Sequence, residues 1–150
     1  MTEADKQFKI AKLGLGDQLK MVKPVPCIYV KEKTIRDWFA KLDSEVNEFK
    51  EAVLQGYRSL NRRADAGMIQ GISITDQPID KVSLSDFILA AHDYNGQKAY
   101  EQALKWHIAE ERADVVTVLT SMMRALDIDD KTVQEAQECV NQSNHRKGRW

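Results

Sequence analysis

The feature that most limits the fold is a helical period in the apolar residues between positions 34 and 55. Seven apolar side chains there fall in one arc, roughly 100° wide, of a helix: Ile35, Trp38, Phe39, Leu42, Val46, Phe49 and Val53. Thr34 and Asp37 have the spacing of a capping box, and Gly56 is a typical helix-terminating residue. The sequence therefore predicts an amphipathic helix from Thr34 to Gln55.

Four other segments have helical patterns, and they lie at residues 4–13, 84–94, 97–126 and 131–144. Ser83 and Asp86 predict the start of the second of these, and Asp130 is predicted as the N-cap of the last. No segment alternates apolar and polar residues over more than four positions, and seven Gly and three Pro leave little room for a turn-rich β architecture. The expected fold class is all-α, a helical bundle of about four to five helices completed by oligomerisation.

The apolar positions of these segments share helix faces. In 84–94 the inward set is Leu84, Phe87, Ile88 and Ala91; one face of 97–126 carries Leu104, Ile108, Val115, Leu119, Met122 and Leu126; and 131–144 carries Val133, Ala136 and Val140. Residues 57–82 have no sustained period and are predicted to be irregular. Residues 22–30 contain a Pro-x-Pro arrangement and are predicted to be extended.

Length and charge set the class of protein. With 150 residues, the chain fits a single domain, 1–150, with an elaborated insertion at about 57–100. The net charge of −1 provides no overall field to attract nucleic acid, and no apolar run approaches the roughly 18 residues of a membrane span. The N-terminus lacks the apolar core of a signal peptide, and Cys27 and Cys139 form neither a disulfide framework nor a zinc site. We expect a cytoplasmic protein with neither a nucleic-acid nor a membrane partner.

Two acidic pairs are candidates for a metal site: Glu45 with Glu48, and Glu111 with Asp114. Side chains three positions apart lie on one helix face, so two such pairs on facing helices would surround a hard divalent cation with oxygen ligands. The chain has five acidic pairs at this spacing, about as many as chance would give. Spacing alone therefore does not identify the site.

The position of each carboxylate on its helix separates these pairs from solvated helix faces. Glu111 falls inside the apolar arc of 97–126, Asp114 lies on its border, and Glu45 lies beside Trp38. A buried carboxylate has to be paired with a cation, protonated or bound to a metal. Because Arg112 points elsewhere on the helix, a metal site is favoured over a structural ion pair.

At these residues the chain resembles the MazG-like all-α nucleoside triphosphate pyrophosphohydrolases. The resemblance rests on KLDSEVNE at 41–48, HIAEERADVVTVL at 107–119 and, more weakly, NQSNHRKGRW at 141–150. It implies a helical bundle that forms homodimers or homotetramers. It also implies Mg²⁺ or Mn²⁺ held by Glu45, Glu48, Glu111 and Asp114, and hydrolysis of a nucleoside triphosphate to a monophosphate and pyrophosphate. The chain departs from many members of the family at Ser44, where they have a second Glu, and in the long separation between the two acidic pairs.

Cations and polar groups are needed to bind the triphosphate that this resemblance implies. The candidates for substrate binding are Lys41, Trp38, Asn141, Asn144, Arg146 and Lys147. Lys41 and the basic tail could neutralise phosphates, although a surface lysine and a solvated basic end are equally compatible with the sequence. Trp38 could stack on a base, but an aromatic residue on an amphipathic helix is more often part of the core. His107 is either a group that orients a carboxylate or a structural histidine.

Two other classes of protein compete with the pyrophosphohydrolase. A di-iron carboxylate bundle would use Glu-x-x-His, and none of the three histidines has Glu three residues before it. A non-catalytic helical oligomerisation or adaptor protein would carry the acidic pairs as surface decoration. The adaptor predicts that replacement of Glu111 by Leu stabilises the fold, whereas the enzyme predicts that this change abolishes nucleotide turnover.

Overall fold

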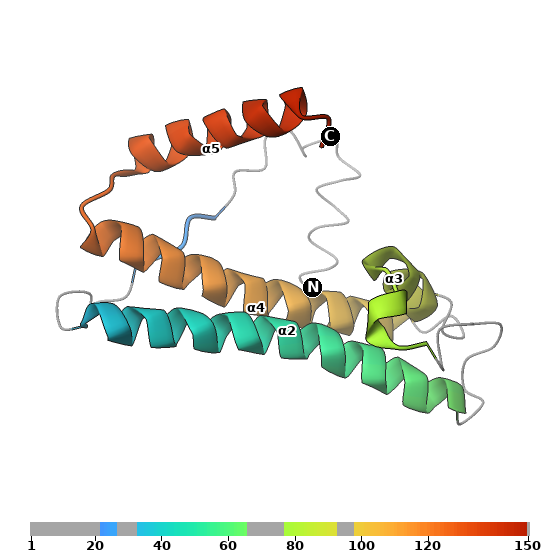
Figure 1. Cartoon of the computed structure of the whole chain (residues 1–150). Coiled ribbons are helices and arrows are strands. Elements are labelled where there is room, and N and C mark those ends of the chain that lie inside the picture. Colours follow the sequence, from blue (N-terminus) through green and yellow to red (C-terminus); the bar gives the residue numbers. More distant parts are fainter. Residues whose placement is uncertain (1–21, 27–32, 66–76, 93–97, 150) are drawn as a thin grey trace. The chain divides into compact units, whose positions relative to one another are not determined.

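The computed structural model describes residues 22–26, 33–65, 77–92 and 98–149 (Figure 1). The helices are α2 (Ile35–Asp65), the 3₁₀ helix η3 (Ile79–Lys81), α3 (Leu84–His92), α4 (Lys98–Ala125) and α5 (Asp130–Arg146). All regular elements in these ranges are helical, which confirms the all-α class for the described part of the chain. The helix predicted at 4–13 lies outside the described residues. Residues 22–26, in the predicted extended connection, have no regular structure.

Side-chain caps start α2 and α3 where the sequence predicts them. Thr34 Oγ1 accepts a hydrogen bond from the Asp37 amide at 3.1 Å, and Asp37 Oδ2 accepts one from the Thr34 amide at 3.0 Å. Hydrogen bonds from the Thr34 amide and from the Thr34 side chain stabilise the ionised carboxylate, so the pKa of Asp37 lies below its usual value. At α3, Ser83 Oγ accepts from the Asp86 amide at 3.0 Å.

The start of α5 differs from the prediction by one residue. Asp129, and not Asp130, is the N-cap: its Oδ1 accepts a hydrogen bond from the Thr132 amide at 2.8 Å. Hydrogen bonds from the Thr132 side chain and from the Thr132 amide lower the pKa of Asp129. Aspartate is a favourable N-cap residue, so the sequence does not distinguish position 129 from position 130. The structure does, because the backbone of Asp129 is extended and the helix begins at Asp130.

The predicted end of α2 at Gly56 is wrong, because the helix continues for nine residues to Asp65. Gly56 is buried, and a Cβ built on it would lie 2.5 Å from Leu104 Cδ1 and 3.0 Å from Phe87 Cζ. The missing side chain therefore lets neighbouring side chains approach the helix backbone. Residues 57–65 are helical rather than irregular, and 66–76 lie outside the described residues.

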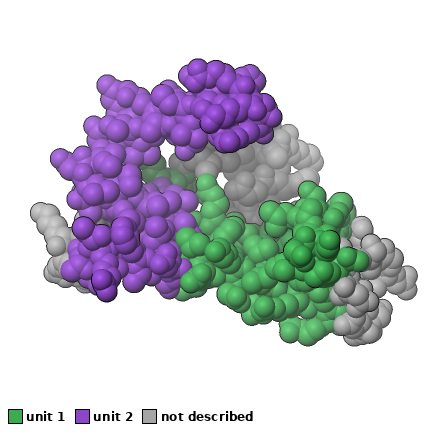
Figure 2. Space-filling model, viewed as in Figure 1, with its two compact units in different colours: residues 1–23, 46–112 green, residues 24–45, 113–150 purple. Residues whose placement is uncertain are grey.

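The chain divides into two compact units, residues 1–23 with 46–112 and residues 24–45 with 113–150 (Figure 2). The core of the first unit contains Leu60 of α2, Phe87, Ala90 and Ala91 of α3, and Leu104 of α4. Packing of α3 against α2 and α4 therefore makes this core. Leu84 was predicted to face inward, but it is 73 % exposed. It is the first residue of α3, and the buried residues of this helix begin one turn later at Phe87.

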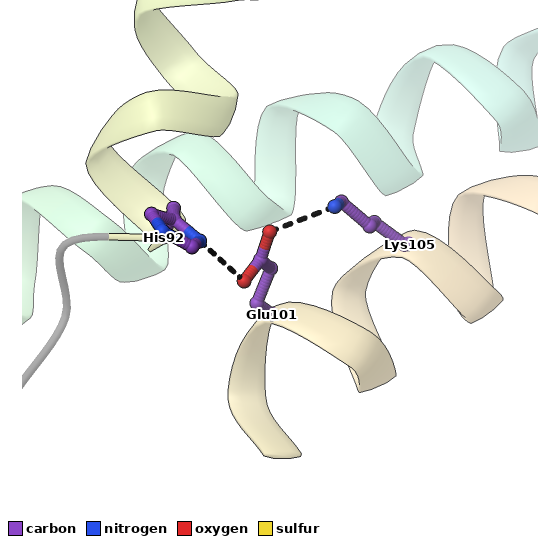
Figure 3. A network of polar contacts seen from close by, with 3 residues as sticks. All are labelled: His92, Glu101 and Lys105. Carbon is purple, nitrogen blue, oxygen red and sulfur yellow. Dashed lines mark hydrogen bonds and ion pairs between the residues drawn. The ribbon is translucent and has the colours of Figure 1, made fainter. Parts of the chain in front are cut away.

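A charged network joins the end of α3 to the start of α4 in the first unit (Figure 3). Glu101 Oε1 lies 2.7 Å from Lys105 Nζ, and Glu101 Oε2 lies 3.0 Å from His92 Nδ1. The Glu101 side chain is only 12 % exposed. The hydrogen bonds from Lys105 and His92 lower the pKa of Glu101 and outweigh the opposing effect of its burial.

In the second unit, Trp38 of α2 and Val118 and Ser121 of α4 are buried. Ser121 Oγ donates a hydrogen bond to the Thr117 carbonyl oxygen at 2.8 Å, so its hydroxyl is satisfied within α4. By contrast, α5 has no buried residue. Among the described helices, none is both long and apolar enough to cross a membrane.

Candidate metal centre

Three carboxylates from two helices come together in the structure. Glu45 of α2 and Glu111 and Asp114 of α4 each offer one oxygen, and these oxygens all lie within 4.8 Å of one another. Glu45 and Asp114 belong to the same compact unit, and Glu111 lies three residues before Asp114 on one unbroken helix. The group therefore follows from packing inside one unit and from helix geometry.

The burial of these side chains is uneven. The Glu45 side chain is 8 % exposed and that of Glu111 is 17 % exposed, whereas Asp114 is exposed. Glu111 Oε2 is buried, and no residue in the described part of the chain forms a hydrogen bond with it. An unsatisfied buried oxygen is costly, and the cost is largest when the group is charged. One buried, one partly buried and one exposed carboxylate form a donor set that fits a hard divalent cation reached from solvent.

Lys41 already provides one positive charge at this group. Its Nζ forms a salt bridge with Glu45 Oε1 across one turn of α2, and the Lys41 side chain is 46 % exposed. The i,i+4 spacing of Lys41 and Glu45 favours this contact, which the sequence did not single out: there Lys41 was a candidate phosphate ligand or a surface lysine. The Glu45 carboxylate therefore has the Lys41 ammonium group as its charged partner in this structure. Because the lysine side chain is long and has a flexible four-carbon stem, the same ammonium group can also reach solvent.

His107 lies one turn before Glu111 on α4. Its Nδ1 is 3.8 Å from Glu111 Oε1, which is too long for a hydrogen bond, and its side chain is 56 % exposed. The contact is therefore electrostatic when the imidazole is protonated, and it leaves Glu111 Oε2 without a partner.

Glu48, the fourth predicted ligand, is exposed and does not belong to the group that the described residues form. The two acidic pairs of the sequence therefore contribute unequally, with both members of the α4 pair and only the first member of the α2 pair. A helix turns by 100° per residue, so residues three apart differ by about 60° in direction, and one can face a neighbour while the other faces water.

Trp38 occupies a core position. It is 6 % exposed, and the ammonium group of Lys33 lies over its ring, 5.8 Å from the centroid. This distance permits a cation–π interaction. Part of the indole surface that could stack on a nucleotide base is thus in contact with protein.

The predicted polar residues of the C-terminal block all lie on α5 or at its end. Asn141 Oδ1 accepts a hydrogen bond from Gln137 Nε2, and Asn144 Oδ1 accepts one from Arg149 Nη1, both at 3.0 Å. Arg146 is the last residue of α5 and Lys147 is its C-cap. An open hollow of about 460 Å³ is lined on α5 by Asn141, Gln142, His145 and Arg146. These residues provide donors and positive charge, the chemistry that an anion requires.

Comparisons of the chain with protein-family models, with curated proteins and with solved structures found no match.

Proposed function

We propose that this chain is a Mg²⁺-dependent nucleoside triphosphate pyrophosphohydrolase that releases a nucleoside monophosphate and pyrophosphate. The observation that carries the proposal is the approach of carboxylate oxygens of Glu45, Glu111 and Asp114 to within 4.8 Å of one another. One buried oxygen of Glu111 also has no hydrogen bond to any of the described residues. The sequence resemblance to MazG-like enzymes, which rests on the same residues, supports it.

Glu45, Glu111 and Asp114 would hold the cation, Mg²⁺ or Mn²⁺, and Glu48 lies one turn further along α2, where it could contribute as well. When bound, the cation supplies the positive charge that a polyphosphate needs at a site built from carboxylates. Without such a charge, the three acidic side chains repel the substrate. The exposure of Asp114 gives the group an open side for the phosphates.

We assign the remaining roles to Lys41, which contacts Glu45, and to polar residues of α5 and its C-terminal end. Lys41 can exchange its salt bridge with Glu45 for a phosphate oxygen, because the cation would replace it as the partner of Glu45. Arg146 and Lys147 can neutralise further phosphate charge, and Asn141 and Asn144 can form hydrogen bonds to substrate. We assign no substrate contact to Trp38, because it is buried in the core. A carboxylate of the group holds the attacking water, which has to lie in line with the bond that breaks.

The test is an assay of a panel of ordinary and modified nucleoside triphosphates with Mg²⁺, in which pyrophosphate and inorganic phosphate are measured separately. We expect pyrophosphate and nucleoside monophosphate in equal amounts. Glu111→Gln and Asp114→Asn should abolish turnover, whereas Glu110→Gln, an exposed neighbour on α4, should retain it. Release of inorganic phosphate alone, or no turnover of any nucleotide, would refute the proposal.

A non-catalytic helical oligomerisation or adaptor protein remains the second candidate. It is favoured by the salt bridge from Lys41 to Glu45, which satisfies that carboxylate without a metal, and by the exposure of apolar side chains such as Phe39 at 56 %. For this class, Glu111→Leu should raise the free energy of unfolding, and Mg²⁺ should change neither that value nor the assembly.

For the pyrophosphohydrolase that we propose as the first candidate, the expected assembly is a cytoplasmic homodimer or homotetramer.

A further inference from the structure

One face of α4 carries a nitrogen donor in line with two oxygen donors. His107, Glu111 and Asp114 follow one another at intervals of four and three residues on this unbroken helix. A helix turns by about 100° per residue, so the three positions point within an arc of about 60°. Glu111 and Asp114 belong to the candidate metal group, and His107 lies one turn before Glu111. The helix therefore places an imidazole next to the carboxylates.

Neither role that the sequence leaves open for His107 fits its geometry. Its Nδ1 atom lies 3.8 Å from Glu111 Oε1, too far for the hydrogen bond with which a histidine orients a carboxylate. Its side chain is 56 % exposed, so it is not a core histidine. Two atoms bound to one six-coordinate ion, with bonds of about 2.1 Å, lie about 3.0 Å apart when adjacent and about 4.2 Å apart when opposite. The distance between His107 and Glu111 falls within this range.

The carboxylate group has room for a further donor. Glu45, Glu111 and Asp114 each offer one oxygen, and these three oxygens lie within 4.8 Å of one another. A six-coordinate ion that takes one oxygen from each still has three positions for other ligands. An exposed side chain changes rotamer rapidly, so the His107 ring can turn toward such an ion without movement of α4.

We propose that His107 is a ligand of the divalent cation, and that the site therefore prefers a first-row transition ion such as Mn²⁺ over Mg²⁺. Imidazole nitrogen is a common ligand of transition ions, whereas Mg²⁺ prefers oxygen donors. Carboxylates alone suit Mg²⁺ and Mn²⁺ alike, so the preference comes from the histidine. This inference rests on the metal site of the proposed function and adds the class of ion. Mg²⁺ still binds through the carboxylates, but less tightly.

The test detects the nitrogen ligand directly. Full-length protein with isotope-labelled histidine nitrogen is loaded with less than one Mn²⁺ per chain, and the bound ion is studied by electron–nuclear double resonance. We expect a coupling between Mn²⁺ and a histidine nitrogen, which His107→Gln should remove. The chain has three histidines, so His92→Gln combined with His145→Gln leaves only His107 and should retain the coupling. Because His107 is exposed, the His107→Gln chain should fold, which circular dichroism would check.

Competition between the two ions gives a second readout. His107→Gln should lower the affinity for Mn²⁺ by about 10-fold or more and that for Mg²⁺ by less than about 2-fold, whereas Glu111→Gln should weaken the binding of both ions. Mn²⁺ that binds without a histidine coupling, or with equal affinity in His107→Gln, would overturn this inference and leave the carboxylate site standing. Absence of saturable Mn²⁺ binding in wild type would overturn both.

Discussion

Replacement of Glu111 by Gln should stabilise the metal-free protein and remove its response to Mg²⁺. One Glu111 oxygen lies within 4.8 Å of oxygens of two other carboxylates, and its Oε2 receives no hydrogen bond from the residues that the structure describes. Two unit charges at that distance repel each other by about 3 kcal/mol at an effective dielectric constant of 20, and by about 1 kcal/mol in water. The exposure of Asp114 and the salt bridge of Lys41 to Glu45 place the net effect near the lower value.

The Gln side chain keeps the shape of Glu and adds an amide group that can donate to the neighbouring carboxylates. We therefore expect the free energy of unfolding without metal to rise by about 1 kcal/mol. Wild type should instead gain about 1.4 kcal/mol from Mg²⁺ at ten times its dissociation constant, because the ion binds only the folded chain. The variant should gain nothing.

The assay is urea denaturation followed by circular dichroism, with and without Mg²⁺, on wild type, Glu111→Gln and the control Glu110→Gln. The control removes one charge from an exposed neighbouring position and should behave as wild type in both conditions. If Glu111→Gln is less stable than wild type without metal, the carboxylates do not repel one another and the reasoning is wrong.

Two other predictions concern the first unit. Gly56→Ala should lower the free energy of unfolding by about 1 kcal/mol, because the clash with Leu104 Cδ1 at 2.5 Å outweighs the gain in helix propensity. In a Leu104→Ala background the same change should be neutral or stabilising, which a double-mutant cycle by urea denaturation checks. The lowered pKa of Glu101 makes its ionised form stabilising above the unfolded-state pKa, and this stability is lost as pH falls through the folded-state pKa. Between about pH 5 and pH 3 the wild type should therefore lose more stability than Glu101→Gln, and equal slopes would contradict the role of the network.

The sequence predicts the helices well because apolar period and capping residues act locally. Thr34 with Asp37 and Ser83 with Asp86 form the expected bonds, since each pair is three residues apart on one helix start. The prediction of a helix end at Gly56 is wrong because the role of this glycine is tertiary: it leaves room for Leu104, a residue 48 positions away. No local rule contains that information.

In the candidate site, too, some features follow from local sequence patterns and others depend on tertiary packing. The apolar arc of α4 correctly placed Glu111 toward the protein interior, and burial of Glu45 follows from its place beside Trp38. Exclusion of Glu48 from the group could not be predicted, because it depends on how α2 is rotated about its axis.

The central claim is that Glu45, Glu111 and Asp114 form a divalent-cation site. The most direct test is titration of the protein with Mn²⁺, with the free ion followed by electron paramagnetic resonance. We predict one saturable site per chain from which Mg²⁺ displaces the Mn²⁺, with affinity at least about 10-fold lower in Glu111→Gln and unchanged in Glu110→Gln. Absence of saturable binding in wild type, or equal affinity in Glu111→Gln, would contradict the claim.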